Sequence, residues 1–318
     1  MRRARGADVD LTTSVGSVTL PNPVMTASGT AGHGAELNPY VDLGSLGAVV
    51  VKSLSAEAWA GNPPLRVHET TGGMINSVGL QGPGVEAWLE HDLPALVAAG
   101  ARVVASIWGR SVAEYEAAAT LLRDAPAAVV AVEVNLSCPN TEAARDLFAH
   151  SEAATADAMA ATAATGRPRW AKLSPNVTDL VPIAAAAQAA GAEAVTLVNT
   201  VMGMAIDPAS GAYRLGSGAR GGGLSGPAIH PIAVRAVHDV HAALPELPIV
   251  GVGGVVAGED AAELVLAGAS AIQVGTATFA DPRAPARVLA ELRAWAARTG
   301  RTKISEHVGA AHEEEPSR

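Results

Sequence analysis

Short apolar segments recur along the chain and alternate with longer stretches of helical periodicity. Each apolar segment holds four to six residues, is rich in Val, Ile, Leu or Ala, and shows little alternation of polar with apolar positions. Continuous apolar runs of this length are typical of parallel strands that are buried on both faces. The pattern predicts eight strands, at residues 23–27, 48–52, 102–107, 131–136, 170–173, 194–198, 248–252 and 271–274.

Alanine-rich segments with helical periodicity lie between the predicted strands. The clearest are residues 112–122, 151–165, 178–190, 228–243 and 259–267. Alternating strands and helices form either a doubly wound open sheet or a closed barrel, and eight repeats without a break in composition favour the barrel. We therefore expect a single (β/α)8 TIM barrel over residues 1–300, with insertions at its C-terminal face.

Composition and charge narrow the range of partners. The chain is 49% hydrophobic and 3% aromatic, carries a net charge of −9, and has no basic run beyond residues 1–5. These features argue against nucleic-acid binding and against attraction to an anionic membrane surface. No stretch reaches the roughly 20 apolar residues that a membrane-spanning helix needs. We expect a soluble, cytoplasmic protein, because no apolar signal core follows the N-terminal arginines.

The end of the chain lacks the repeating pattern, and the cysteine and histidine residues do not form a recognisable metal-binding motif. After Gly300 the repeating pattern is lost and residues 313–315 are acidic, so residues 301–318 are expected to form a disordered tail. The single cysteine excludes an iron–sulfur cluster or zinc ribbon held by this chain alone, since such sites need about four ligands. The histidines show no H-E-x-x-H pattern, so we predict no metal site.

Turn-forming residues concentrate directly after the predicted strands. Gly, Pro, Asn and Ser are frequent at residues 53–84, 137–141, 199–226 and 253–258. In a (β/α)8 barrel these segments are the loops at the C-terminal face, where active sites of this fold lie. We therefore expect the residues of the active site to lie in these four loops.

A lone thiol, Cys138, lies in the sequence Asn-Leu-Ser-Cys-Pro-Asn at the end of the fourth predicted strand. A free cysteine is most often a buried structural residue, and its own surroundings do not decide between that role and catalysis. Amide side chains lie on this loop and on two others, and each alone is commonly a turn residue. As a set they suit a planar ligand with alternating carbonyl and N–H groups, such as a pyrimidine; they are Asn76, Asn135, Asn140 and Asn199.

Two lysines and two glycine-rich turns also fall at strand ends. Lys52 and Lys172 either extend from the rim into solvent or meet an anion in the barrel mouth. The last two predicted strands end at residues 251–254 and 275–276, where barrels commonly hold a phosphate. These residues do not match the dinucleotide-binding motif, because their glycine spacing is not G-x-G-x-x-G and no acidic residue stands at the end of the next strand. A mononucleotide such as FMN fits these turns better than NAD.

Taken together and in order, these motifs resemble the class 1 dihydroorotate dehydrogenases over residues 20–292. The segments that carry the resemblance are residues 22–29, 52–53, 76–84, 135–140, 199–207 and 222–227, with the two glycine turns. The stretch from Asn199 to Asp207, followed by Gly-Gly-Leu-Ser-Gly-Pro, is similar to the class 1B branch. The resemblance implies FMN-dependent oxidation of dihydroorotate to orotate in pyrimidine biosynthesis.

The resemblance also implies roles for individual residues. Cys138 is the expected general base on C5 of the substrate, while a hydride leaves C6 for FMN. The expected substrate-binding residues are Lys52, Asn76, Ser77, Val78, Gly79, Leu80, Asn135, Asn140, Asn199 and Thr200. The expected FMN-binding residues are Ser28, Lys52, Ser53, Ser106, Asn135, Lys172, Val198, Gly226, Gly253, Gly254, Gly275 and Thr276. Ser106 departs from the asparagine that the family often has at this position.

The class 1B branch further implies a partner. Its FMN subunit is understood to pair with a second subunit that carries FAD and a 2Fe-2S cluster and passes electrons to NAD. The lack of cluster cysteines in this chain agrees with such a division, and a homodimer or heterotetramer is expected.

Two other functions remain open at this point. One is a related flavin barrel that acts on a different dihydropyrimidine, since neutral amides also fit uracil. Lys52 favours dihydroorotate, because orotate has a carboxylate that needs a cation. The other is a barrel that binds FMN or a pyrimidine without turnover. The presence of Cys138 and Lys172 disfavours this second alternative.

Overall fold

Eight parallel strands form the central sheet of this protein in a computed structural model that describes residues 9–137, 148–216 and 221–313. In spatial order they are β3 (Val24–Thr26), β14 (Ala271–Val274), β13 (Ile249–Val252), β10 (Ala194–Leu197), β9 (Arg169–Lys172), β8 (Val129–Asn135), β7 (Val103–Ile107) and β4 (Val49–Val50). The two outermost strands meet, since Met25 pairs with Ala48 and the Gly47 N–H donates to the Val24 carbonyl at 2.8 Å. The predicted barrel is confirmed, and all eight predicted strands overlap those observed.

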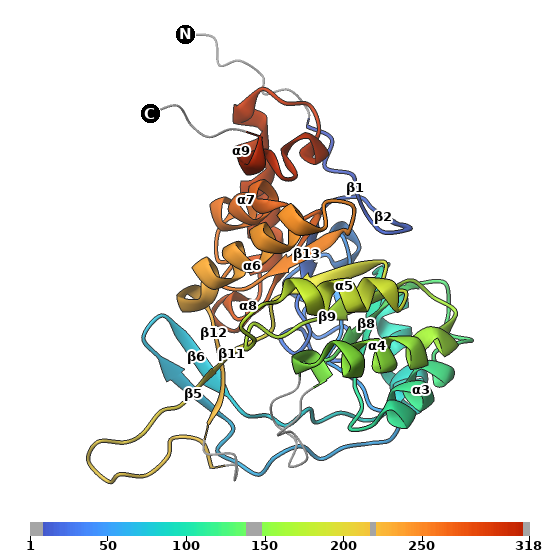
Figure 1. The fold of residues 1–318 in the computed structure, drawn as a ribbon, viewed down its shortest axis with the longest axis vertical. Helices are drawn as coiled ribbons and strands as arrows, with labels where there is room; N and C mark the ends of the chain where they lie inside the picture. The colour runs from blue at the N-terminus through green and yellow to red at the C-terminus, as the bar shows by residue number, and fades with distance from the viewer. Residues whose placement is uncertain (1–8, 138–147, 217–220, 314–318) are drawn as a thin grey trace.

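Helices cover the outside of the barrel (Figure 1). The five predicted helices correspond to α3 (Val112–Leu121), α4 (Glu152–Ala161), α5 (Val181–Ala189), α6 (His230–Ala243) and α7 (Gly258–Ala267). Ser111 and Ser151 cap α3 and α4 by accepting from backbone N–H groups of the first turn. Further helical segments that the sequence pattern did not predict are α1 (Val85–Ala87), a π-helical turn (Trp88–Asp92), α2 (Leu93–Ala98), α8 (Ala277–Ala280) and α9 (Ala284–Thr299).

The interior of the barrel is apolar at its N-terminal end. Trp170, Met25 and Val104 are fully buried there, together with small residues of the neighbouring strands. An antiparallel hairpin, β1 (Thr13–Val15) with β2 (Val18–Leu20), adds its buried side chains to the same cluster. This hairpin therefore closes the bottom of the barrel, and the open end is the C-terminal face.

A second sheet rises from the C-terminal face. It is antiparallel, with the order β11 (Val201–Gly203), β12 (Gly222–Ser225), β6 (Gly73–Asn76) and β5 (Val67–Thr70), and it projects beside the barrel in Figure 1. Its strands come from the two long segments that the sequence marked as loops after β4 and β10. These segments are instead paired with each other, for example where Asn76 lies opposite Gly223.

The C-terminal segment differs from the expected disordered tail. Residues 301–313 form two short 3-10 turns, Ile304–His307 and Ala310–His312, that pack on the barrel. Ile304 is 1% exposed, and its N–H donates to the Asp10 carbonyl at 2.9 Å. His307 is buried against the ring of Trp295, with ring centroids 4.7 Å apart. Burial of these two side chains fixes a segment that has no helical or strand periodicity; residues 314–318 lie outside the described part of the chain.

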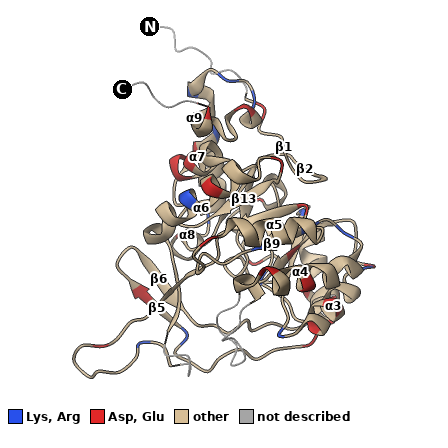
Figure 2. Cartoon of the chain, viewed as in Figure 1, with Lys and Arg blue, Asp and Glu red and all other residues tan. Residues whose placement is uncertain are grey.

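Charged residues of both signs are distributed over the outer helices and connecting loops (Figure 2). Several form ion pairs one turn apart on a helix, such as Arg235 with Asp239 and Arg287 with Glu291. Such exposed pairs contribute little to stability, about 0.3–0.5 kcal/mol each. No helix within the described residues has the length and apolar character to cross a bilayer.

We predict that Ile304→Ala lowers the free energy of unfolding by about 2–5 kcal/mol, because it removes a buried side chain that anchors the C-terminal segment. Ser305→Ala, at the exposed neighbouring position, is the matched control and changes it by less than about 0.5 kcal/mol. Urea unfolding followed by circular dichroism measures both. Equal stability of the two variants would contradict the observed docking of residues 301–313.

Candidate active site

One cavity opens at the C-terminal ends of the barrel strands, between the barrel and the second sheet. Its lining joins the strand ends of the barrel to residues of the second sheet, such as Val67, Met74 and Asn76. Most residues predicted from sequence line it: Ser28, Lys52, Ser53, Asn76, Val78, Gly79, Leu80, Asn135, Lys172, Val198, Asn199, Thr200, Gly226, Gly253, Gly254, Gly275 and Thr276. Residues far apart in the chain thus share one wall.

Four predicted residues are placed differently or lie outside the described residues. Ser106 does not line the cavity but lies behind Ser53, whose hydroxyl it contacts at 2.9 Å. Ser77 is fully buried, and its N–H donates to the Arg66 carbonyl at 2.8 Å. Cys138 and Asn140 fall in residues 138–147, outside the described part of the chain.

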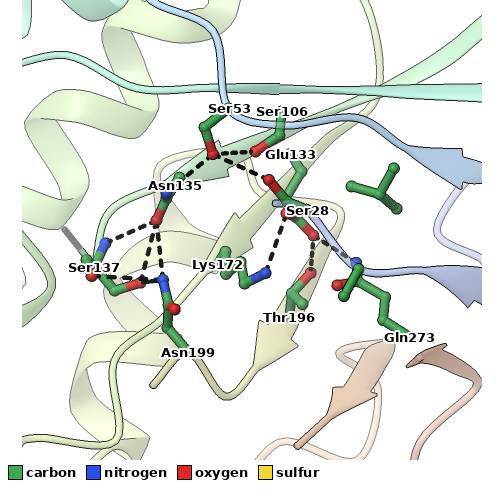
Figure 3. Close-up of polar contacts among 12 residues, drawn as sticks. Ser28, Ser53, Ser106, Glu133, Asn135, Ser137, Lys172, Thr196, Asn199 and Gln273 are labelled. Carbon is green, nitrogen blue, oxygen red and sulfur yellow. Dashed lines mark hydrogen bonds and ion pairs between the residues drawn. The ribbon is translucent and has the colours of Figure 1, made fainter. Parts of the chain in front are cut away.

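Asn135, the last residue of β8, is the centre of a hydrogen-bond network (Figure 3). Its amide nitrogen donates to the Ser53 hydroxyl at 3.1 Å, and its amide oxygen accepts from Asn199 at 3.2 Å. The same oxygen accepts from the backbone and the hydroxyl of Ser137 at 3.3 and 3.2 Å. The Tyr115 hydroxyl holds the backbone of Asn135 by donating to its carbonyl at 2.8 Å. Asn135 therefore ties the loops after three strands into one rigid wall.

Lys172 ends β9 and lies beside Asn135 in the strand register. The residue is 5% exposed although it lines the cavity, and its Nζ lies 3.6 Å from Oε1 of the fully buried Glu133. A buried ammonium needs compensating charge or hydrogen bonds, and Glu133 supplies the charge, as the dashed line between the two side chains in Figure 3 shows. The arrangement presents a fixed cation to a ligand in the cavity.

Glycines form the opposite wall, where the chain leaves β12, β13 and β14. Gly226 and Gly254 have φ angles of +98° and +69°, which side chains rarely adopt. A Cβ on Gly254 would lie 2.6 Å from Cβ of His230, so the close approach also requires glycine. Nδ1 of His230 contacts the Gly253 carbonyl at 2.8 Å and fixes this turn. Such a turn brings bare backbone to the cavity, as phosphate binding requires.

The second sheet supplies the cover of the cavity. Leu80 lines it with a φ of +59°, a left-handed conformation that is unusual for a residue with a side chain and is frequent at functional loops. Asn76 donates to the Gly223 carbonyl at 3.2 Å, which joins β6 to β12. The Thr276 hydroxyl donates to that of Ser225 at 2.8 Å and links this sheet to the barrel.

Lys52 faces a second, more open hollow as well as the main cavity. The two share Gly29, Lys52 and Val78, and His33 lines the outer one. Burial lowers the pKa of the His33 imidazole; nearby Asp92 opposes this shift and Lys52 adds to it. His33 is accordingly neutral at neutral pH, and Lys52 is the charged group where the two spaces meet.

The sequence did not point to every residue of the wall. Ser137, Ser225, Ile229 and Phe279 also line the cavity. Glu133, Thr196 and Gln273 form a polar layer directly beneath it. Glu133 and Gln273 could have been found, because each is a polar residue inside an otherwise apolar predicted strand.

Comparison with known proteins agrees with this geometry. Residues 10–295 match the family model described as dihydroorotate dehydrogenase. The chain belongs to the dihydroorotate dehydrogenase family. This match covers all eight barrel strands and all of the residues that line the cavity.

Individual relatives are similar over nearly their full length. The chain is 48% identical over 300 residues to the dihydroorotate dehydrogenase B (NAD(+)) catalytic subunit of Desulforudis audaxviator, covering 94% of this chain and 96% of the relative. It is 44% identical over 302 residues to the protein of the same name from Geobacter sulfurreducens, covering 95% and 98%. A protein of Solibacter usitatus, provisionally named dihydroorotate dehydrogenase A (fumarate), is 46% identical over 300 residues, covering 94% and 97%.

Proposed function

We propose that this chain is a catalytic subunit that oxidises dihydroorotate to orotate with FMN, in the formation of pyrimidines. The observation that carries the proposal is the convergence of a buried lysine, a network of amides and a glycine cradle on one cavity of a chain from this family. The relatives named as catalytic subunits favour turnover over binding alone. Their names also favour dihydroorotate over another dihydropyrimidine.

The described residues fit FMN. The turns at Gly226, Gly253–Gly254 and Gly275 line the cavity with backbone alone, as phosphate binding requires, and a Cβ at Gly226, Gly253 or Gly254 would collide with neighbouring atoms of the protein. The Ser53 hydroxyl and the Asn135 amide line the same cavity as that cradle and Lys172, which suits the polar edge of a flavin ring. When bound, FMN supplies the acceptor for two electrons. Lys172 is positioned to stabilise the negative charge that the cofactor gains on reduction.

Binding of the substrate is assigned to the amide groups and to Lys52. Asn76, Asn135 and Asn199 can each donate and accept, which matches the alternating carbonyl and N–H groups of a dihydropyrimidine ring. Lys52 supplies a cation for the carboxylate. The amide of Asn199 is oriented by its bonds to Asn135 and Ser137, so the ring would be held without rearrangement of the wall.

Cys138 is proposed as the base that removes the proton from C5 of dihydroorotate. Oxidation breaks C–H bonds at C5 and C6, so the substrate must lose a proton to the protein as well as two electrons and a proton to an acceptor. The residue that precedes Cys138 in sequence, Ser137, lines the cavity and is 2% exposed. The ordinary pKa of a cysteine is about 8.5, so a thiolate is an effective base near neutral pH when its site lowers that pKa toward the working pH.

We further propose that electrons leave through a partner. The word "subunit" in the names of the relatives indicates an additional chain in those enzymes. A partner with FAD and a 2Fe-2S cluster that reduces NAD would explain why this chain has one cysteine and no dinucleotide fingerprint. Association into a homodimer or heterotetramer and a cytoplasmic location belong to the same proposal.

We predict that Gly254→Ala weakens FMN binding at least about tenfold. Its new Cβ would lie 2.6 Å from Cβ of His230, so the turn that forms the phosphate cradle would have to shift. Gly211→Ala is the matched control, since Gly211 has nearly the same φ, +70°, with nothing within 4 Å of the added carbon. Flavin fluorescence during titration of the apoprotein measures the dissociation constants. If both variants bound FMN equally weakly, the role of Gly254 in the phosphate cradle would be rejected.

We predict that Cys138→Ala retains FMN but reduces it with dihydroorotate at least about a hundredfold more slowly, the usual worth of a positioned base. Cys138→Ser should retain part of the rate with its optimum at higher pH, because a hydroxyl loses its proton less readily than a thiol. Anaerobic stopped-flow absorbance measures the rate. Unchanged kinetics in the alanine variant would remove the role assigned to Cys138.

A further inference from the structure

Glu133 is a buried carboxylate for which the proposed reaction has no use. It belongs to β8, two residues before Asn135, and is 0% exposed inside the barrel. Its Oε2 accepts from the Gln273 amide at 2.6 Å and from the Thr196 hydroxyl at 3.1 Å. Its Oε1 has no hydrogen-bond partner within the described residues and faces Lys172 (Figure 3). The carboxylate is therefore oriented from one side and leaves its other oxygen toward the ammonium.

Stability alone gives a poor reason for this arrangement. The layer below is apolar and well packed, and replacing a buried ion pair with apolar side chains is often neutral or stabilising. Two further buried polar residues, Thr196 and Gln273, donate hydrogen bonds to the carboxylate. Both charges are almost fully shielded from water, so the field of each reaches the cavity with little screening.

We propose that Glu133 balances the charge of Lys172 and thereby lowers the reduction potential of the flavin in the cavity. This rests on the proposed binding of FMN. Two-electron reduction with uptake of one proton adds one negative charge to the cofactor. Lys172 favours that charge and Glu133, one layer deeper, opposes it. The pair keeps the reduced cofactor from becoming so stable that it fails to pass its electrons onward.

The test is the midpoint potential of the FMN-loaded protein, measured by equilibration with redox dyes under anaerobic conditions. Glu133→Gln keeps the side-chain shape and removes the negative charge. We expect the reduced-to-oxidised ratio at a fixed potential to rise at least tenfold, an upward shift of about 30 mV for a two-electron couple. An unchanged or lowered potential would overturn the proposal.

A double-mutant cycle that neutralises each charge in turn separates charge balance from a structural role. Lys172→Met should lower the potential, and adding Glu133→Gln to it should raise the potential again, because the wall then returns to zero net charge. A double variant no higher than Lys172→Met would contradict the proposal. This comparison also serves if Glu133→Gln alone does not fold, since the double variant contains no unpaired buried charge.

Thr196→Val is the matched control within the same network. It removes one hydrogen bond to Glu133 and leaves the charge, so the ratio should change less than about threefold. If the midpoint potential of Thr196→Val shifted as much as that of Glu133→Gln, side-chain packing and not the charge of Glu133 would set the potential. If the wild-type protein binds no flavin, the proposed function fails, and this proposal with it. A flavin-loaded protein without the predicted shift rejects only the role of Glu133.

Discussion

The alternation of side chains along parallel strands that close into a barrel is the constraint on which this site depends. Successive residues of a strand point to opposite faces, so every second residue enters the barrel. Along β8 the inward series passes from Ala131 through Glu133 to Asn135, and along β9 from Trp170 to Lys172. The interior therefore changes from apolar packing to a charged layer and then to the cavity wall. A shift of one residue in either strand would destroy both core and site.

The polar layer formed by Glu133, Thr196 and Gln273 does not destabilise the fold strongly, because its polar groups are paired. Glu133 receives two hydrogen bonds and the Lys172 ammonium, and Asn135 shares its oxygen among Ser137 and Asn199. Unpaired groups at this depth would cost about 1–3 kcal/mol each, more if charged. The network consequently fixes the positions of its members before any ligand arrives, which is what binding of a planar ring requires.

Sequence pattern was sufficient for the barrel because buried parallel strands are continuous apolar runs. Strand ends then located the cavity, so residues such as Lys172 and Asn199 could be named from their positions. The second sheet could not be predicted, since β12 reads Gly-Gly-Leu-Ser and pairs with β6 across roughly 150 residues of sequence. Docking of Ile304 was equally hidden, because a single buried side chain carries no periodicity. Glu133 was missed although its place within an apolar strand was visible.

Membership in the dihydroorotate dehydrogenase family and the geometry of the cavity support the same reaction: this barrel removes a proton and a hydride from dihydroorotate. The most direct test is anaerobic mixing of the FMN-loaded protein with dihydroorotate, with dihydrouracil, which lacks the carboxylate, as control. The proposed reaction predicts that dihydroorotate bleaches the visible absorbance of the flavin and yields orotate in equal amount, while dihydrouracil bleaches the flavin far more slowly. A flavin that stays oxidised with dihydroorotate, or that is bleached faster by dihydrouracil, would contradict it.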